Sequence, residues 1–180
     1  MSGSGWTSTS MPYLTPRAAG DRDAWTEEAA AAGHRGGQRI LHAGETDAPS
    51  AVARKLGLPD GAAVTVRRRI IERDGTPIEL TDTYYPADIA AGTPLAGTAK
   101  IRGGAVTLLA TLGHVGVRAV ENVTARMPSA EERTQLHLPE GQPVLQLSRT
   151  TYDSADRPIQ ADIMVMPAER QQLQYEIRIG

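Results

Sequence analysis

Apolar and polar residues alternate along two pairs of neighbouring segments, and this period of two predicts two β-hairpins. The first hairpin comprises residues 64–72 and 78–85, and the second comprises residues 144–152 and 159–166. Further strands are expected at 38–43, 117–126 and 173–179, with helices at 21–32, 50–56, 104–112 and 129–136. Because strands outnumber helices and tight turns join them, we expect an α+β fold, with helices packed on one face of a largely antiparallel sheet.

The two hairpins belong to an internal repeat. The segment LGLPDG at 56–61 recurs as LHLPEG at 136–141, and the match extends to Arg69 in the first copy and Arg149 in the second. Each copy is a short helix, a turn and a hairpin. We therefore expect two pseudo-repeated helix-hairpin halves packed around a pseudo-symmetric centre, where a pocket can form. Two units that simply share a core would give the same pattern.

The turn of the first hairpin decides which side chains share a face. Asp74-Gly75 marks this turn. A two-residue loop would place polar residues opposite apolar ones, so we expect a three-residue loop at 73–75, which puts the even-numbered residues on one face. That face is apolar and carries Arg68 and Asp82 as a cross-strand ion pair.

The opposite face of each hairpin is polar and carries arginine. These side chains are Arg67, Arg69, Thr81 and Thr83 in the first hairpin, and Arg149, Gln160 and Asp162 in the second. Solvent exposure would explain such a face. A concave small-molecule site would explain it too, because a pocket needs a few convergent polar groups.

Composition narrows the class of protein. The chain has 180 residues, a formal net charge of −2 and no cysteine. One domain is expected at this length, and the charge argues against direct binding of nucleic acid by this chain. The four histidines show no metal-ligand spacing, so we predict no metal site, and the glycines form no nucleotide-binding pattern, so we predict no cofactor. No apolar run is long enough to be a signal or to cross a membrane, which favours a cytoplasmic protein.

The first twenty residues are rich in Gly, Ser, Thr and Pro and have no hydrophobic period. They are expected to be a tail that Trp6 and Tyr13 hold against the body. We divide the chain into an N-terminal arm and helix, residues 1–35, and a second domain, residues 36–180.

The order of several motifs resembles the UTRA domain, the ligand-sensing domain of HutC-type regulators in the GntR family. The motifs are VTVRRRIIERDGTPIELTDTYYP at 64–86, the helix that runs from Gly103-Gly104 to Leu112-Gly113-His114, VENVTARMPSAEER at 120–133, and RTTYD at 149–153. The resemblance implies a chorismate-lyase-like fold, a homodimer and a buried site for a small-molecule effector. It also implies a winged helix-turn-helix ahead of the domain, and nothing in this sequence matches one. Two interpretations follow: the chain is the sensor part of a regulator separated from its DNA-binding part, or it is a stand-alone sensor, for which a separate winged-helix partner could supply the contact with DNA.

The resemblance carries the family's ligand residues over only in part. The strand arginine of the family falls on Arg69, but a second arginine, used by members that bind phosphorylated sugars, falls on Ile71. The glutamate of the return strand falls on Thr81, and the hydroxyl residue that starts the middle helix falls near Gly104. In the second hairpin the carboxylate position falls on Gln160, with Asp162 beside it. These departures predict a less charged, partly apolar effector with one anionic or carbonyl group for Arg69.

Two other classes of function remain open. A chorismate-lyase-like enzyme would use Arg69 and Arg149 to hold a carboxylated substrate, but no tuned acid or base is visible in the sequence. An interaction module would bind another protein through exposed hairpin edges. We expect a sensor that is not an enzyme.

Overall fold

The computed structural model describes residues 5–18, 21–177 and 179. The strands are β1 (Trp6–Ser8), β2 (Gly36–Asp47), β3 (Ala63–Arg73), β4 (Thr76–Pro86), β5 (Arg118–Arg126), β6 (Val144–Tyr152), β7 (Pro158–Pro167) and β8 (Gln171–Leu173). The helices are α1 (Met11–Leu14), α2 (Ala24–Ala31), α3 (Ser50–Leu56), α4 (Ala87–Ala90), α5 (Ala105–Thr111) and α6 (Ala130–Gln135), with a 3₁₀ turn η1 at Pro94–Ala96. The described part of the chain is thus mixed α and β, as expected.

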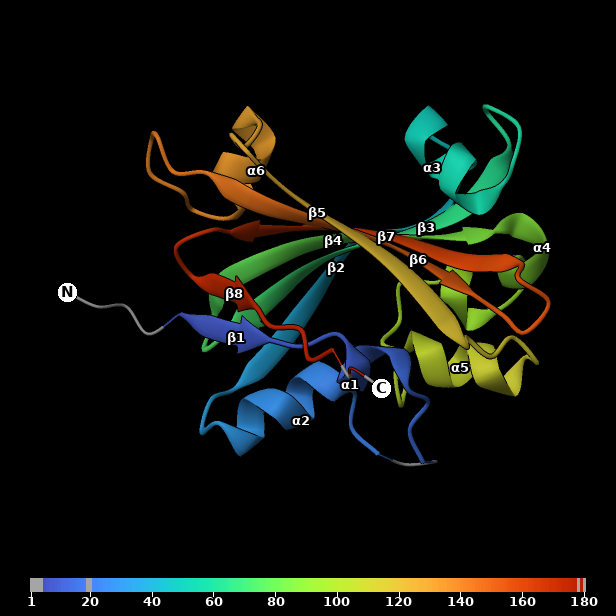
Figure 1. Ribbon diagram of the computed structural model, residues 1–180, viewed down its shortest axis with the longest axis horizontal. Helices are drawn as coiled ribbons and strands as arrows, with labels where there is room; N and C mark the ends of the chain where they lie inside the picture. Colours follow the sequence, from blue (N-terminus) through green and yellow to red (C-terminus); the bar gives the residue numbers. More distant parts are fainter. Residues whose placement is uncertain (1–4, 19–20, 178, 180) are drawn as a thin grey trace.

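Six strands form one antiparallel sheet in the order β2-β3-β4-β7-β6-β5. The two predicted hairpins, β3-β4 and β6-β7, lie side by side through β4 and β7 at its centre. Each half has the same order of strand, short helix and hairpin (Figure 1). The repeat therefore corresponds to two similar halves that meet in the middle of the sheet.

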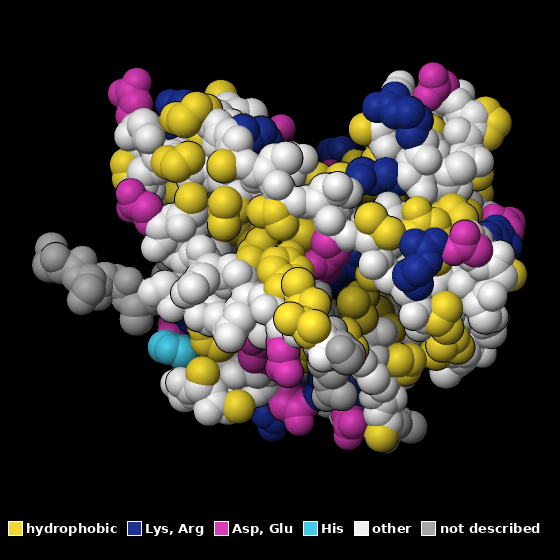
Figure 2. Space-filling model, viewed as in Figure 1, with side chains coloured by type: hydrophobic (Ala, Val, Ile, Leu, Met, Phe, Trp, Pro, Cys, Tyr) yellow, Lys and Arg dark blue, Asp and Glu magenta, His cyan; other side chains and the backbone are white. Residues whose placement is uncertain are grey.

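Helices lie on both faces of this sheet, so the expectation of one covered face is wrong. The two helices of the repeat, α3 and α6, lie above the sheet on either side of a hollow (Figure 1 and Figure 2), whereas α1, α2 and α5 lie below it (Figure 1). The upper face carries the even-numbered residues of the first hairpin, and Val64 and Val66 pack there against α3. The lower face also carries large apolar groups, among them Tyr85, which is buried against α4 and α5. Since burial of apolar area stabilises the fold, both faces are covered.

In the first hairpin the even-numbered residues share a face as predicted, but the loop is shorter than predicted and a β-bulge compensates for the difference. Arg73 pairs with Thr76, so the loop has only two residues, Asp74 and Gly75, both with positive φ (51° and 82°). The register then shifts at Ile78, because Ile71 pairs with Glu79 and Glu72 pairs with Pro77. This bulge adds the extra residue that we had assigned to the loop, and it restores the even-numbered apolar face.

The predicted ion pair confirms this register. Arg68 Nε lies 3.1 Å from Asp82 Oδ2 on the upper face. Ile78 itself leaves that face and packs below the sheet against Trp6 and Trp25.

Both ends of the described chain depart from the expected pattern. Residues 6–8 form β1, which pairs in parallel with β8, and residues 11–14 form α1, where the sequence predicts only a tail. Trp6 is buried and Tyr13 is partly buried, so both hold this segment to the body as expected. The predicted strand at 173–179 is wrong for the described residues, because only Gln171–Leu173 pair with another strand; residue 178 of that range lies outside the described residues.

The helices α2, α3 and α6 differ in how their N-termini are capped. Ser129 caps α6 in a capping box with Glu132, and Asp23 caps α2 by accepting a hydrogen bond from the backbone of Thr26. Pro49 is the N-cap residue of α3, which therefore has no side-chain cap. None of the described helices is long and apolar enough to span a membrane.

Candidate ligand-binding site

A cavity of about 170 Å³ lies below the sheet, between its lower face, the N-terminal residues, α2 and α5. Seven of the eight residues predicted from the sequence line it: Arg67, Arg69, Thr81, Gly104, Arg149, Gln160 and Asp162. Thr83 lies behind the wall and contacts the lining residues. The alternation thus predicted which side chains share a face, and the structure brings them together around one cavity.

Arg69, Thr83 and Asp162 form a chain of hydrogen bonds across the centre of the sheet. Arg69 Nη2 donates to Thr83 Oγ1 at 2.9 Å, and Thr83 Oγ1 donates to Asp162 Oδ1 at 2.7 Å. Gln160 Nε2 donates to the other carboxylate oxygen at 2.8 Å. Asp162 is 3% exposed, so the chain fixes a buried carboxylate and orients the guanidinium of Arg69.

One hydrogen-bond donor of Arg69 has no partner within the described protein. Its Nε is buried and has no acceptor among the described residues. A buried N–H without a partner is costly, since it has lost water and gained nothing in return. This atom belongs to a residue that lines the cavity, so an acceptor on a bound molecule would satisfy it.

The other two arginines that the sequence predicted for this site, Arg67 and Arg149, form hydrogen bonds within the protein. Arg67 donates to the carbonyl oxygens of Pro94, Leu95 and Ala99 at 3.1, 3.2 and 3.1 Å, and also to that of Gly97. It thus fixes the segment around η1, and its desolvation lowers the pKa of the guanidinium. Its predicted role toward a ligand would require these bonds to be shared.

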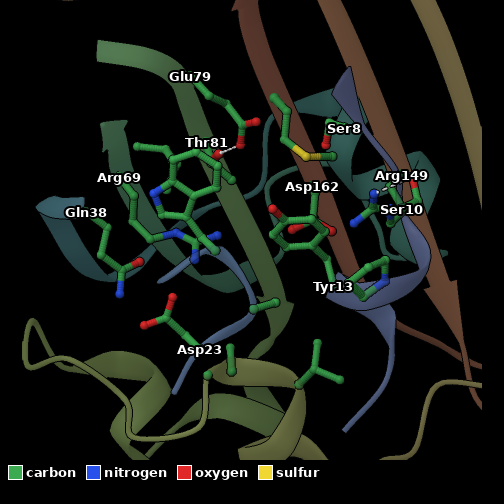
Figure 3. A pocket seen from close by; sticks show the side chains of 18 of the residues that line it. Ser8, Ser10, Tyr13, Asp23, Gln38, Arg69, Glu79, Thr81, Arg149 and Asp162 are labelled. Carbon is green, nitrogen blue, oxygen red and sulfur yellow. Dashed lines mark hydrogen bonds between the residues drawn. The ribbon is translucent and has the colours of Figure 1, made fainter. Parts of the chain in front are cut away.

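Arg149 donates from Nε to Glu121 Oε1 at 2.6 Å and from Nη2 to Ser10 Oγ at 2.9 Å. Arg149 and Glu121 are 7% and 13% exposed at the side chain, so this is a buried ion pair. Figure 3 shows Arg149 with Ser10 at one side of the cavity and Arg69 at the other, with Asp162 between them. No pattern in the sequence connects Ser10 or Glu121 with this site.

Glu79 is a further cavity residue that we did not select. Its carboxylate accepts a hydrogen bond from Thr81, and burial raises the pKa of Glu79 although Arg69 and Arg149 act to lower it. It was expected on this face of the hairpin by its odd number. Selecting it required knowledge that the face is enclosed, which the alternation does not contain.

Apolar and aromatic groups complete the wall. Trp25 lines the cavity and is held by bonds from Nε1 to the carbonyls of Gly37 and Glu72, both at 3.1 Å. Tyr13 lines it from α1, and Met164 and Met166 line it from β7. The arrangement can hold a small molecule whose apolar body meets these groups and whose acceptor meets Arg69. Within residues 5–18, 21–177 and 179, no group of three or more His, Asp or Glu side chains could hold a metal ion.

Comparisons with known proteins agree with this architecture. The profile of the UTRA domain matches residues 31–172, so the chain belongs to the UTRA domain family. It is 31% identical over 166 residues to an uncharacterized HTH-type transcriptional regulator of Streptomyces coelicolor, covering 89% of this chain and 61% of the relative. It is 27% identical over 132 residues to the HTH-type transcriptional repressor PhnF of Mycolicibacterium smegmatis, covering 73% and 53%. The chain thus spans only about half to three-fifths of these curated relatives.

Solved structures share the fold. The effector domain of PhnF from Mycobacterium smegmatis superposes with a TM-score of 0.74 at 24% identity, covering 92% of this chain and 99% of that domain. The ligand-binding domain of a GntR-family regulator from Bordetella bronchiseptica gives 0.70 at 27% identity, covering 79% and 92%. These matches confirm the chorismate-lyase-like α+β fold and the effector-binding class of domain expected from the sequence.

Proposed function

We propose that this chain binds a small-molecule effector in the cavity below the sheet and acts as the sensor of a HutC-type, cytoplasmic transcriptional regulator. The observation that carries the proposal is the buried, unpartnered Nε of Arg69 beside an apolar wall. Thr83 and Asp162 already hold the guanidinium in place, so little ordering is needed when a ligand arrives.

The effector that fits is small and partly apolar, with one carboxylate or carbonyl group for Arg69. Arg67 and Arg149 are already bonded within the protein, and Ile71 occupies the position where a second free guanidinium would bind a phosphate. Glu79 adds a carboxyl group that would oppose a doubly charged anion. Phosphate-dependent, tight binding of a hexosamine phosphate would contradict this assignment.

A thermal-shift screen of the purified chain against a metabolite panel tests the proposal. At a ligand concentration of about 100 times Kd, binding adds roughly 2.7 kcal/mol to stability. For a domain of this size, this raises Tm by roughly 2–4 °C per kcal/mol. The ligand is then recovered and analysed by mass spectrometry. A ligand that is recovered chemically unchanged supports a sensor, whereas a ligand that has been converted to a product supports the lyase-like alternative.

The proposal includes two protein partners. The DNA-binding function would come from a winged-helix protein or segment, and co-purification with such a protein would support it. A second copy of the chain would pair along β5, an edge strand of the sheet on which Val120 and Val123 are 42% and 45% exposed. Light scattering should show a dimer that Val123→Lys dissociates; a monomeric native chain would contradict this.

A further inference from the structure

Residues 5–17, here called the cap segment, form one side of the cavity. Ser8, Ser10, Tyr13, Thr15 and Arg17 all line it. The opposite walls belong to the sheet and to α5, which lie far along the chain from this segment. A ligand in the cavity would therefore contact the cap segment directly.

The cap segment is anchored firmly at its start. Trp6 packs edge-to-face on Trp25 with ring centroids 5.2 Å apart, and its backbone N–H donates to Arg170 at 2.8 Å. The three residues of β1 pair in parallel with β8. Gln174 adds a bond of 2.9 Å to the carbonyl of Ser8.

Beyond Ser8 most of the contacts are polar, and Tyr13 provides the apolar contact of this stretch, against the cluster of Trp6 and Trp25. Ser10 accepts from Arg149, and Tyr13 donates to Glu28. Arg17 pairs with Glu27, and its backbone N–H donates to Thr107 Oγ1 at 3.0 Å. The helix α1 buries none of its four residues, and Met11 is 68% exposed.

This distribution of contacts makes the segment a candidate for local opening. Segments with few buried apolar contacts open at a lower free energy than the core does. When the segment opens, water can take the place of the polar partners of Ser10, Tyr13 and Arg17. In contrast, the sheet and α5 that form the other walls are held by apolar clusters.

We propose that residues 10–17 of the cap segment are the gate of the effector cavity: they swing away from Arg149 and Glu28 to admit the ligand and close over it, while residues 6–8 stay paired with β8. The proposal rests on the proposed function, since a gate matters only if the cavity receives an effector. It adds that closure is linked to occupancy, because the ligand touches the cap segment from inside.

The test measures opening without any effector. The chain has no cysteine, so Met164→Cys places a single thiol in the cavity wall. Its rate of reaction with Ellman's reagent is compared between the native cap and a loosened cap, Ser10→Ala with Arg17→Ala. A matched control, Ser129→Ala with Arg68→Ala, also removes one hydrogen bond and one ion pair, but outside the cap segment. Thr81→Cys serves as a second reporter.

We expect the loosened cap to react about tenfold faster than the native cap, with the control within about twofold of native. Equal rates in all three proteins would overturn the proposal, because access would not pass through the cap. An equal increase in the control would also overturn it, because the thiol would then react through global unfolding. Failure of the metabolite screen would instead count against the proposed function and leave this result standing.

Discussion

The hydroxyl of Thr83 donates a hydrogen bond of 2.7 Å to Asp162 across the seam between the two hairpins of the repeat. The two residues are paired in the register of β4 and β7, 79 positions apart in sequence. Thr83 also accepts from Arg69, so the junction of the two halves orients the cavity's arginine. The duplicated architecture and the ligand site thus share the same residues.

This junction predicts a measurable coupling. Thr83→Val and Asp162→Ala should each lower the free energy of unfolding by about 1–3 kcal/mol, because each leaves a buried polar partner unsatisfied. The loss of unfolding free energy in the double variant should be smaller than the sum of the two single losses, by at least about 0.5 kcal/mol. Urea unfolding measures all three. Asp88→Ala, which removes an exposed ion pair with Arg157, is the control and should cost at most about 1 kcal/mol.

Glu79 predicts a pH dependence of stability. Because burial raises the pKa of Glu79, the folded state prefers the protonated carboxyl, and ionisation destabilises it as pH rises above the unfolded pKa. Glu79→Gln should therefore have a higher Tm than the native chain at neutral pH, and the difference should shrink as the solution becomes acidic. The exposed Glu140→Gln should show no such trend. The account would be refuted if the Tm difference, Glu79→Gln minus native, were smaller at neutral pH than in acid.

The capping box of α6 predicts a difference between two serines. Ser129 Oγ accepts from Glu132 N–H at 3.1 Å, and the Glu132 carboxylate accepts from Ser129 N–H at 2.8 Å. Ser129→Ala should cost about 1 kcal/mol of unfolding free energy. Ser50→Ala, at the start of the uncapped α3, should cost almost nothing. Similar losses at both positions would mean that the capping box does not stabilise the protein.

The repeat predicts opposite effects at two equivalent positions. Gly57 ends α3 with φ 65°, and His137 follows α6 at the matching position with φ 50°. The left-handed conformation favours glycine, so His137→Gly should stabilise the protein by about 0.5–1 kcal/mol, and Gly57→Ala should destabilise it by about 1 kcal/mol. Denaturant midpoints measure both. Changes of the same sign would contradict the assigned equivalence.

Alternation along the chain was sufficient to predict the sheet and the face that holds the site. It predicted Arg69, Thr81 and Asp162 on one side because side-chain direction in a strand follows from residue number. It missed the bulge at Ile78, because a bulge and a three-residue turn give the same parity. The twofold order of elements was visible as a sequence repeat, since both copies keep the same turn residues.

Tertiary contacts explain what the sequence could not show. The segment at 6–14 has no hydrophobic period, and its structure depends on Trp25 and on β8, which lie elsewhere in the chain. The alternation after Leu173 indicated a strand, but alternation does not provide a partner strand. Glu79 and Ser10 became site residues only when the cavity was seen to be enclosed.

The central claim is that Arg69 binds the effector, and its neighbour Arg68 provides the sharpest comparison. The two arginines are adjacent on β3 but face opposite sides of the sheet, with Arg68 paired to Asp82 above it. Calorimetry should measure binding of the first ligand found in the screen to the native chain, Arg68→Ala and Arg69→Ala. We predict that Arg69→Ala weakens binding roughly tenfold to hundredfold, as expected for loss of a charged hydrogen bond, and that Arg68→Ala binds like the native chain. Equal affinities for all three, or a loss confined to Arg68→Ala, would contradict the account.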